Sequence, residues 1–216
     1  MNEKVILCYG DSNTWGWVPG TGARFPRNVR WPGILQQALG DGHYVIEEAL
    51  NGRTTVWEDP IEQHKNGAAY LPACLDSHEP IDLAIVKLGG NDLKKRFSLS
   101  PYDIAQGIGT LHRLIEVSRA GYAAQAPSVL VVAPAPYTDI LPKWKGMFEG
   151  AVDKSAQLAP LYEAVAAEHG AAFFNAGDVI TPSPIDGVHY SAEAHRTLGE
   201  KLADVVRNLL LTSNEF

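Results

Sequence analysis

The sequence predicts a single-domain α/β fold of three layers, in which helices cover both faces of a five-stranded parallel sheet. Short apolar runs rich in β-formers recur along the chain, with helical periodicity between them. The runs are continuous rather than alternating, as is typical of strands buried on both faces. Strands that alternate with helices favour parallel pairing. The predicted strands are Val5–Tyr9, Tyr44–Ala49, Leu83–Leu88, Val129–Ala133 and Ala172–Asn175.

Helical periodicity is clearest in four segments. Ser100 and Pro101 form a typical helix start, with serine as the N-cap and proline in the first helical position. Ser191 could cap the last helix in the same way. We find no repeat and no linker, so one domain should span residues 1–216. The predicted helices are Pro32–Leu39, Pro101–Ala120, Lys154–His169 and Ala192–Leu211.

Composition and charge exclude some classes of function. The chain is 45% hydrophobic and 20% charged, which is ordinary for a globular domain, and its formal net charge is −7. An acidic chain without a basic run argues against binding a nucleic-acid backbone. The densest basic cluster is Lys94, Lys95 and Arg96, which we expect to be solvated surface.

Targeting signals and cysteines suggest a compartment. The N-terminal apolar run is too short for a signal peptide, and no apolar stretch could cross a bilayer. Cys8 and Cys74 both lie in apolar surroundings, so we expect two buried free thiols in a reducing environment. These observations predict a cytoplasmic protein without a membrane or nucleic-acid partner.

Polar, glycine-rich loops follow four of the predicted strands. Gly10-Asp11-Ser12 follows the first, Asn51-Gly52-Arg53 the second, Gly89-Gly90-Asn91-Asp92 the third and Pro134-Ala135-Pro136 the fourth. The carboxyl ends of parallel strands meet at one edge of a sheet, where ligands bind in open α/β folds. The topology therefore predicts a site at this edge.

The residues needed for nucleophilic catalysis by a serine occur in these loops and before the last helix. Asp186 and His189 in "PIDGVHYS" are close enough for a turn to bring carboxylate and imidazole together. The imidazole could then accept the proton of Ser12. Oxyanion donors could come from the Ser12 backbone N–H, from Gly52 and from the Asn91 amide.

Each of these patterns has an ordinary structural explanation. "GDS" commonly marks a turn after a strand, "GGND" a tight turn, and a D-x-x-H pair a helix cap beside a surface histidine. Their joint position at the ends of predicted strands and before the last helix favours the catalytic interpretation.

The motifs together resemble the SGNH hydrolases, also called GDSL esterases and lipases. Ser12 lies in "GDSN", Gly52 in "NGRTT", Asn91 in "GGND" and His189 in "DGVH", with Asp186 at the position of the family's acid. "WGWVP", "VRWPGIL", "VIEEAL" and "NGAAYLPACLDSH" resemble the arylesterase and acyltransferase branch. Asn13 replaces the usual leucine after the serine.

The resemblance implies a flavodoxin-like SGNH hydrolase fold and a serine esterase acting on short-chain, acetyl-type aryl or alkyl esters through an acyl-enzyme. Ser12, His189 and Asp186 would be the catalytic triad, without a metal or other cofactor. The acyl group could pass to water or to an alcohol. The alternative is a carbohydrate acetylesterase with the same apparatus. The resemblance also favours a homo-oligomer.

Three residues near the nucleophile are candidates for the substrate pocket. Trp15 and Trp17 could line an apolar acyl or alcohol site, although at least one of them should be core. Asp11, next to the serine, is the third candidate.

Two other readings of the sequence are open. Cys74 and His78, four residues apart on a possible helix, could form a thiol–imidazole pair, although a core cysteine is the simpler interpretation. A phosphate-binding α/β domain is the other, but neither G-x-x-x-x-G-K-[ST] nor G-x-G-x-x-G is present.

Overall fold

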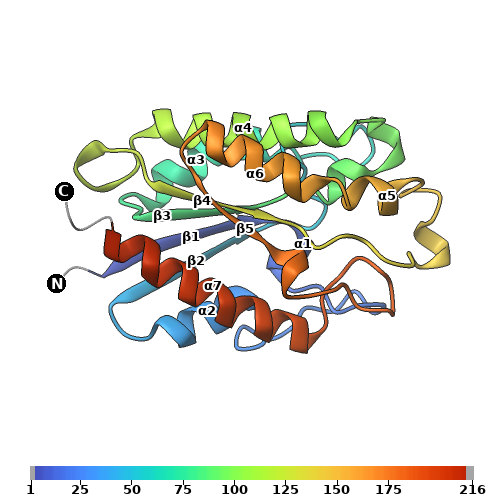
Figure 1. Ribbon diagram of the computed structural model, residues 1–216, viewed down its shortest axis with the longest axis horizontal. Coiled ribbons are helices and arrows are strands. Elements are labelled where there is room, and N and C mark those ends of the chain that lie inside the picture. The colour runs from blue at the N-terminus through green and yellow to red at the C-terminus, as the bar shows by residue number, and fades with distance from the viewer. Residues whose placement is uncertain (1–2, 213–216) are drawn as a thin grey trace.

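The computed structural model describes residues 3–212 and confirms the single-domain, three-layer α/β/α architecture (Figure 1). A parallel five-stranded sheet forms the central layer, in the order β2-β1-β3-β4-β5. The two ends of the described chain lie at the same end of the molecule. The strands are β1 (Lys4–Gly10), β2 (His43–Ala49), β3 (Leu83–Lys87), β4 (Ser128–Ala133) and β5 (Ala172–Asn175).

Helices cover both faces of this sheet. One face carries α3, α4, α5 and α6, and the opposite face carries α2 and α7, which pack against each other (Figure 1). The helices are α1 (Ser12–Trp15), α2 (Trp31–Leu39), α3 (Gly67–His78), α4 (Pro101–Ser118), α5 (Ala151–Ser155), α6 (Leu158–Glu168) and α7 (Ala192–Thr212).

The strands contribute side chains to two separate apolar cores, because successive side chains point to opposite faces of the sheet. In β1, Leu7 and Tyr9 join the core under α3, α4 and α6, whereas Ile6 and Cys8 join the core under α2 and α7. This two-sided burial explains why the strands read as continuous apolar runs.

The predicted helix caps are present. Ser100 and Asp103 form a capping box at the start of α4, and the Ser191 hydroxyl accepts a hydrogen bond from the Ala194 N–H at 3.1 Å. Each cap satisfies backbone N–H groups that have no partner within the helix.

One predicted helix is divided in the structure. The predicted helix Lys154–His169 is instead two helices, α5 and α6. The Ser155 hydroxyl donates to the Val152 carbonyl at 2.7 Å and accepts from the Tyr137 N–H at 2.8 Å. Hydroxyl bonding to an earlier carbonyl distorts a helix, which accounts for the break.

Helix α3 lacks a strong sequence signal because Pro72 lies inside it and removes one backbone donor. It forms because the Asn66 side chain caps its start and because Leu71, Cys74 and Leu75 pack into the core. Tertiary packing therefore outweighs local propensity here.

The described helices do not include one with the length and apolar character needed to cross a bilayer.

The strand order places a crevice between β1 and β3. The connection after β1 leads to β2 on one side, and the connection after β3 leads to β4 on the other side. Open α/β sheets bind ligands at such a switch point, beyond the carboxyl ends of the strands. Ser12 follows β1 and Asn91 follows β3, so both lie at this position.

Candidate active site

Ser12 begins the single-turn helix α1, directly after β1. The Asp11 side chain accepts a hydrogen bond from the Asn13 N–H at 2.9 Å and so caps this turn. Gly16 ends the turn in the left-handed conformation, with φ of 89°, which glycine adopts without strain. The cap at one end and the glycine at the other hold Ser12 at the edge of the sheet.

His189 lies on a tight loop that Asp186 organises. One Asp186 oxygen, Oδ1, accepts from the backbone N–H groups of Val188 and His189, at 3.1 and 2.9 Å. The other oxygen, Oδ2, lies 3.0 Å from His189 Nδ1 and 3.1 Å from the Gly20 nitrogen. Burial opposes the charge of Asp186, but the hydrogen bonds from His189 and Val188 outweigh it and lower the pKa of the carboxyl below its usual value.

The structure brings Ser12, His189 and Asp186 into one hydrogen-bonded chain. Ser12 Oγ lies 3.0 Å from His189 Nε2, and all three side chains are buried. Because the carboxylate accepts the proton on Nδ1, Nε2 is left as an acceptor for the serine hydroxyl. The chain can therefore move a proton away from the hydroxyl.

Asn13 ties the serine turn to the histidine loop. Its amide donates to the Val188 carbonyl at 3.2 Å, and its carbonyl accepts from the Tyr190 N–H at 3.1 Å. These are the residues on either side of His189. The sequence singled out Asn13 only as a departure from a motif, because its partners are distant along the chain.

Two indole rings flank the His189 imidazole. Trp17 is stacked on it, with centroids 5.3 Å apart and an interplanar angle of 22°. Trp144 meets it edge-on, with centroids 5.5 Å apart. The rings limit rotation of the imidazole and exclude solvent from it. Trp144 was not among the predicted site residues, because it lies on the loop between β4 and α5, far along the chain from Ser12 and His189.

Candidate oxyanion donors also lie beside Ser12. Ser12, Gly52 and Asn91 line the same pocket. Asn91 Nδ2 donates to the Arg53 carbonyl at 3.1 Å, which fixes the amide next to Gly52 and leaves its second N–H available. Gly52 has φ of 82°, and a side chain there would also collide with the Glu62 carboxylate.

The pocket at Ser12 encloses about 200 Å³ and has two chemically different walls. Its apolar wall consists of Trp17, Tyr137, Trp144, Met147, Phe148 and Val188, and its polar wall of Asn51, Gly52, Glu62, Lys65, Asn91 and Lys94. A larger hollow of about 430 Å³, which includes Thr138 and Val152, contains neither Ser12 nor His189.

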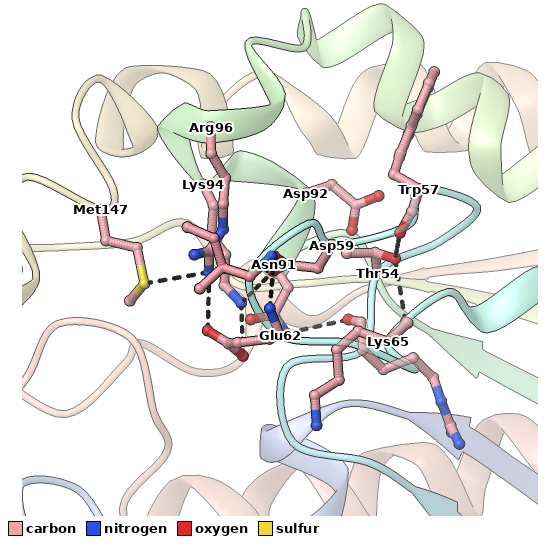
Figure 2. A network of polar contacts seen from close by, with 12 residues as sticks. Thr54, Trp57, Asp59, Glu62, Lys65, Asn91, Asp92, Lys94, Arg96 and Met147 are labelled. Atoms are coloured by element: carbon pink, nitrogen blue, oxygen red, sulfur yellow. Dashed lines mark hydrogen bonds and ion pairs between the residues drawn. The ribbon is translucent and has the colours of Figure 1, made fainter.

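The polar wall corrects the expectation that Lys94, Lys95 and Arg96 are solvated surface. Lys94 is buried and bridges to Asp59 at 3.4 Å and to Glu62 at 3.2 Å. Arg96 pairs with the same two carboxylates (Figure 2). Of the three basic residues, only Lys95 is exposed. Lys94 is buried because Asp59 and Glu62, on the loop before α3, compensate its charge. These partners are distant along the chain, so a local run of basic residues does not reveal them.

The three residues proposed for the pocket have different positions. Trp17 lines it. Trp15 is not among the lining residues, because its ring packs under the Arg24 guanidinium, 4.8 Å away. Asp11 is also outside the lining and is 3% exposed, since its carboxylate caps α1.

The thiol–imidazole alternative does not suit a nucleophile. Both cysteines are buried and free, as expected. Burial raises the pKa of Cys74 to about 12, so the thiol is protonated at neutral pH. His78 instead pairs with Glu48 at 2.8 Å. The ligand atoms of Glu48, Cys74 and His78 lie within 4.8 Å of one another and could hold a metal ion, but these residues do not line the pocket.

A serine–histidine–aspartate chain at the switch point of a parallel α/β/α sheet defines a serine hydrolase. Comparison with known proteins agrees. The model of the GDSL-like lipase/acylhydrolase family matches residues 8–197, and the chain belongs to this family. It is therefore a carboxylic ester hydrolase of the GDSL type. A search of curated protein sequences gave no match.

Solved structures of similar proteins cover nearly the whole chain. A carbohydrate acetylesterase from Sinorhizobium meliloti is 44% identical with a TM-score of 0.93, over 96% of this chain and 100% of that one. An aryl esterase from M. smegmatis is 46% identical with a TM-score of 0.91, over 95% of this chain and 99% of that one. A GDSL family member from Veillonella parvula, 15% identical over 94% of this chain and 98% of that one, with a TM-score of 0.67, shares the fold.

Proposed function

We propose that the protein hydrolyses short-chain, acetyl-type esters of aryl or alkyl alcohols, with Ser12 as nucleophile, His189 as general base and Asp186 as its partner. The observation that carries this proposal is the pair of 3.0 Å contacts, from Ser12 Oγ to His189 Nε2 and from His189 Nδ1 to Asp186 Oδ2. Asp186 fixes the tautomer of His189 and stabilises the imidazolium that forms.

The reaction proceeds in two halves. Ser12 Oγ attacks the ester carbonyl carbon while its proton passes to Nε2 of His189. The carbonyl oxygen becomes an oxyanion, held by the backbone N–H groups of Ser12 and Gly52 and by the Asn91 amide. The intermediate collapses, the imidazolium protonates the leaving alcohol, and an acyl-Ser12 ester remains. Water, deprotonated by His189, then releases the carboxylic acid and restores Ser12.

The pocket favours a small acyl group. Its volume of about 200 Å³ lies below the roughly 300–1,000 Å³ of sites for drug-sized ligands. Bulky indoles at Trp17 and Trp144 occupy the space beside His189. We therefore expect kcat/KM for p-nitrophenyl esters to fall steeply as the acyl chain lengthens beyond a few carbons.

The decisive test replaces Ser12. Ser12→Ala should lose ester hydrolysis and labelling by a fluorophosphonate, while Ser98→Ala, at an exposed loop serine, keeps both. Far-UV circular dichroism of both variants checks the fold. Near-wild-type hydrolysis by a folded Ser12→Ala variant would remove Ser12 from the mechanism.

Transfer of the acyl group to alcohols is the second part of the proposal. Indole rings on both sides of His189 give the second nucleophile an apolar approach, in which water loses more hydrogen bonding than an alcohol does. With vinyl acetate and dilute benzyl alcohol, we expect benzyl acetate beside acetate in the product mixture. Acetate as the only product would contradict this part.

A carbohydrate acetylesterase is the alternative candidate. The polar wall, with Asn51, Glu62 and Lys65, supports it because such groups can bond sugar hydroxyls. The similarity to the S. meliloti enzyme supports it as well. The comparison to make is kcat/KM for a peracetylated pyranoside against phenyl acetate. A large excess for the sugar ester would establish the alternative.

We also propose a cytoplasmic homo-oligomer. The compartment is inferred from two buried free thiols, Cys8 and Cys74. Assembly is inferred from exposed apolar side chains, including Ile61 and Ile185, at 71% and 59% exposure. Light scattering after size exclusion tests the assembly, and a monomer at micromolar concentration would refute it. Cell fractionation tests the compartment.

A further inference from the structure

Lys87 is a buried cation at the end of β3, outside the proposed triad. It pairs in register with Gly10, the last residue of β1. Leu83 and Ile85, four and two positions earlier, belong to the core under α2 and α7, so alternation places the Lys87 side chain on that face. Its exposure is 0%. A lysine is almost never buried completely without a compensating partner.

Its environment compensates the charge through an aromatic ring and a carboxylate. The ammonium lies 4.6 Å from the centroid of the Tyr190 ring, a cation–π contact, and has no hydrogen-bond acceptor among residues 3–212. Burial lowers the pKa of Lys87, but Tyr190 and the buried Asp11 carboxylate outweigh burial and raise it above its usual value. Lys87 is therefore charged at neutral pH.

Both compensating groups are neighbours of the proposed catalytic residues. Asp11 precedes Ser12 and caps its turn through the Asn13 N–H. Tyr190 follows His189, and its N–H donates to the Asn13 side chain at 3.1 Å. The Lys87 ammonium thus interacts with the segment that carries the nucleophile and with the segment that carries the base.

We infer that Lys87 is a positioning residue, whose buried charge holds the Ser12 turn and the His189 loop together. The inference rests on the proposed function, which assigns Ser12 and His189 their roles.

Lys87 also interacts with His195, on α7. Burial is the largest cause that lowers the pKa of His195 to about 3, and Lys87 is the next, so this imidazole is neutral and adds no second positive charge beside the ammonium.

The test compares Lys87→Met, which keeps the length but removes the charge, with Lys87→Arg, which keeps the charge. Lys4→Met is the matched control, because Lys4 is a partly exposed lysine on β1 with an ion pair to Asp82. Two readouts are needed: kcat and KM for phenyl acetate, measured separately, and the rate at which a fluorophosphonate labels Ser12.

For Lys87→Met we expect kcat for phenyl acetate to fall about tenfold with little change in KM, because misplaced reacting groups weaken the transition state more than substrate binding. We expect labelling to slow by about tenfold, since small misplacement of reacting groups costs that much or more. Lys87→Arg should recover most of both effects, and Lys4→Met should match wild type.

A folded Lys87→Met variant with the wild-type kcat and labelling rate would overturn the inference. If that variant does not fold, Asp11→Asn/Lys87→Met removes both buried charges. A folded double variant that labels at the wild-type rate would overturn the inference equally. Failure of the proposed function itself would give a different result, because a fluorophosphonate would then label the wild-type protein no faster than it labels Ser12→Ala.

Discussion

His189 shows how single residues build this site. Its two ring nitrogens face Asp186 and Ser12, and its two ring faces or edges meet Trp17 and Trp144. These contacts fix tautomer, orientation and solvent access together. A base oriented in advance need not reorganise when the proton moves, which is a large part of how such sites lower a barrier.

Substitution of Asn91 is a direct test of the proposed oxyanion site. Asn91→Ala removes one donor, and loss of one oxyanion donor typically reduces kcat about 10²–10³-fold. KM should change much less, because the donor acts mainly on the transition state. Steady-state kinetics with phenyl acetate measures both. Unchanged kcat in a folded variant would show that Asn91 does not stabilise the oxyanion.

His195 makes stability depend on pH. Burial lowers its pKa to about 3, while an unfolded histidine has a pKa of about 6.5. The unfolded chain therefore binds the proton first, and this stability is full above about pH 6.5 and lost as the pH falls toward 3. The loss is about 1.4 kcal/mol per pH unit, or about 2 kcal/mol at pH 5.

Urea unfolding at pH 7 and pH 5 tests this linkage. In the wild-type protein, His195 Nδ1 accepts a hydrogen bond from the Trp31 backbone N–H at 3.2 Å. In His195→Asn, the asparagine side chain keeps an acceptor for this N–H but has no titratable group. It should lose about 2 kcal/mol less than wild type between the two pH values. His64→Asn, at an exposed position, is the control. Equal losses in wild type and His195→Asn would contradict the prediction.

At the scale of elements, close packing of α7 on α2 orients the loop that carries His189. Gly199 lies where the two helices meet, and a Cβ there would come within 2.6 Å of the Ile34 Cβ and 2.8 Å of the Trp31 carbonyl oxygen. Glycine is unfavourable inside a helix, so its presence reflects this close approach.

Gly199→Ala should therefore destabilise the protein, although alanine is the better helix former by about 1 kcal/mol. Overpacking against backbone and a branched side chain typically costs about 1–3 kcal/mol. Glu200→Ala, at the next and exposed position of α7, tests helix propensity alone and should change stability little. Thermal or urea unfolding gives both values. A more stable Gly199→Ala variant would show that the helices separate without cost.

At the scale of the whole molecule, the site exists only when both cores are formed. Ser12 follows β1, Asn91 follows β3, and His189 precedes α7, so their convergence needs the sheet and the helices on both faces. Loss of esterase activity, of tryptophan fluorescence and of helical circular dichroism should then share one midpoint in urea. Activity lost well before the spectroscopic signals would mean that the site opens independently.

Much of this could be predicted from the sequence, because local chemistry dictates it. All five strands follow from apolar runs, and the start of α4 from Ser100 and Pro101. The residues that lie together at Ser12 follow a strand or precede a helix. Their hydroxyl, imidazole, carboxylate and amide groups are those that ester hydrolysis by a serine requires. Backbone periodicity and side-chain chemistry are properties of short segments, so a sequence displays them directly.

Other features were decided only by tertiary structure. Pro72 argues locally against α3, yet burial of Leu71 and Cys74 forms the helix. Lys94 is buried only because Asp59, on a distant loop, forms an ion pair with it. Lys87 can lie in a buried strand because the Tyr190 ring packs on its ammonium. The physical reason is common to these cases: the free energy of a buried charge or helix depends on partners far along the chain, and folding alone brings them together.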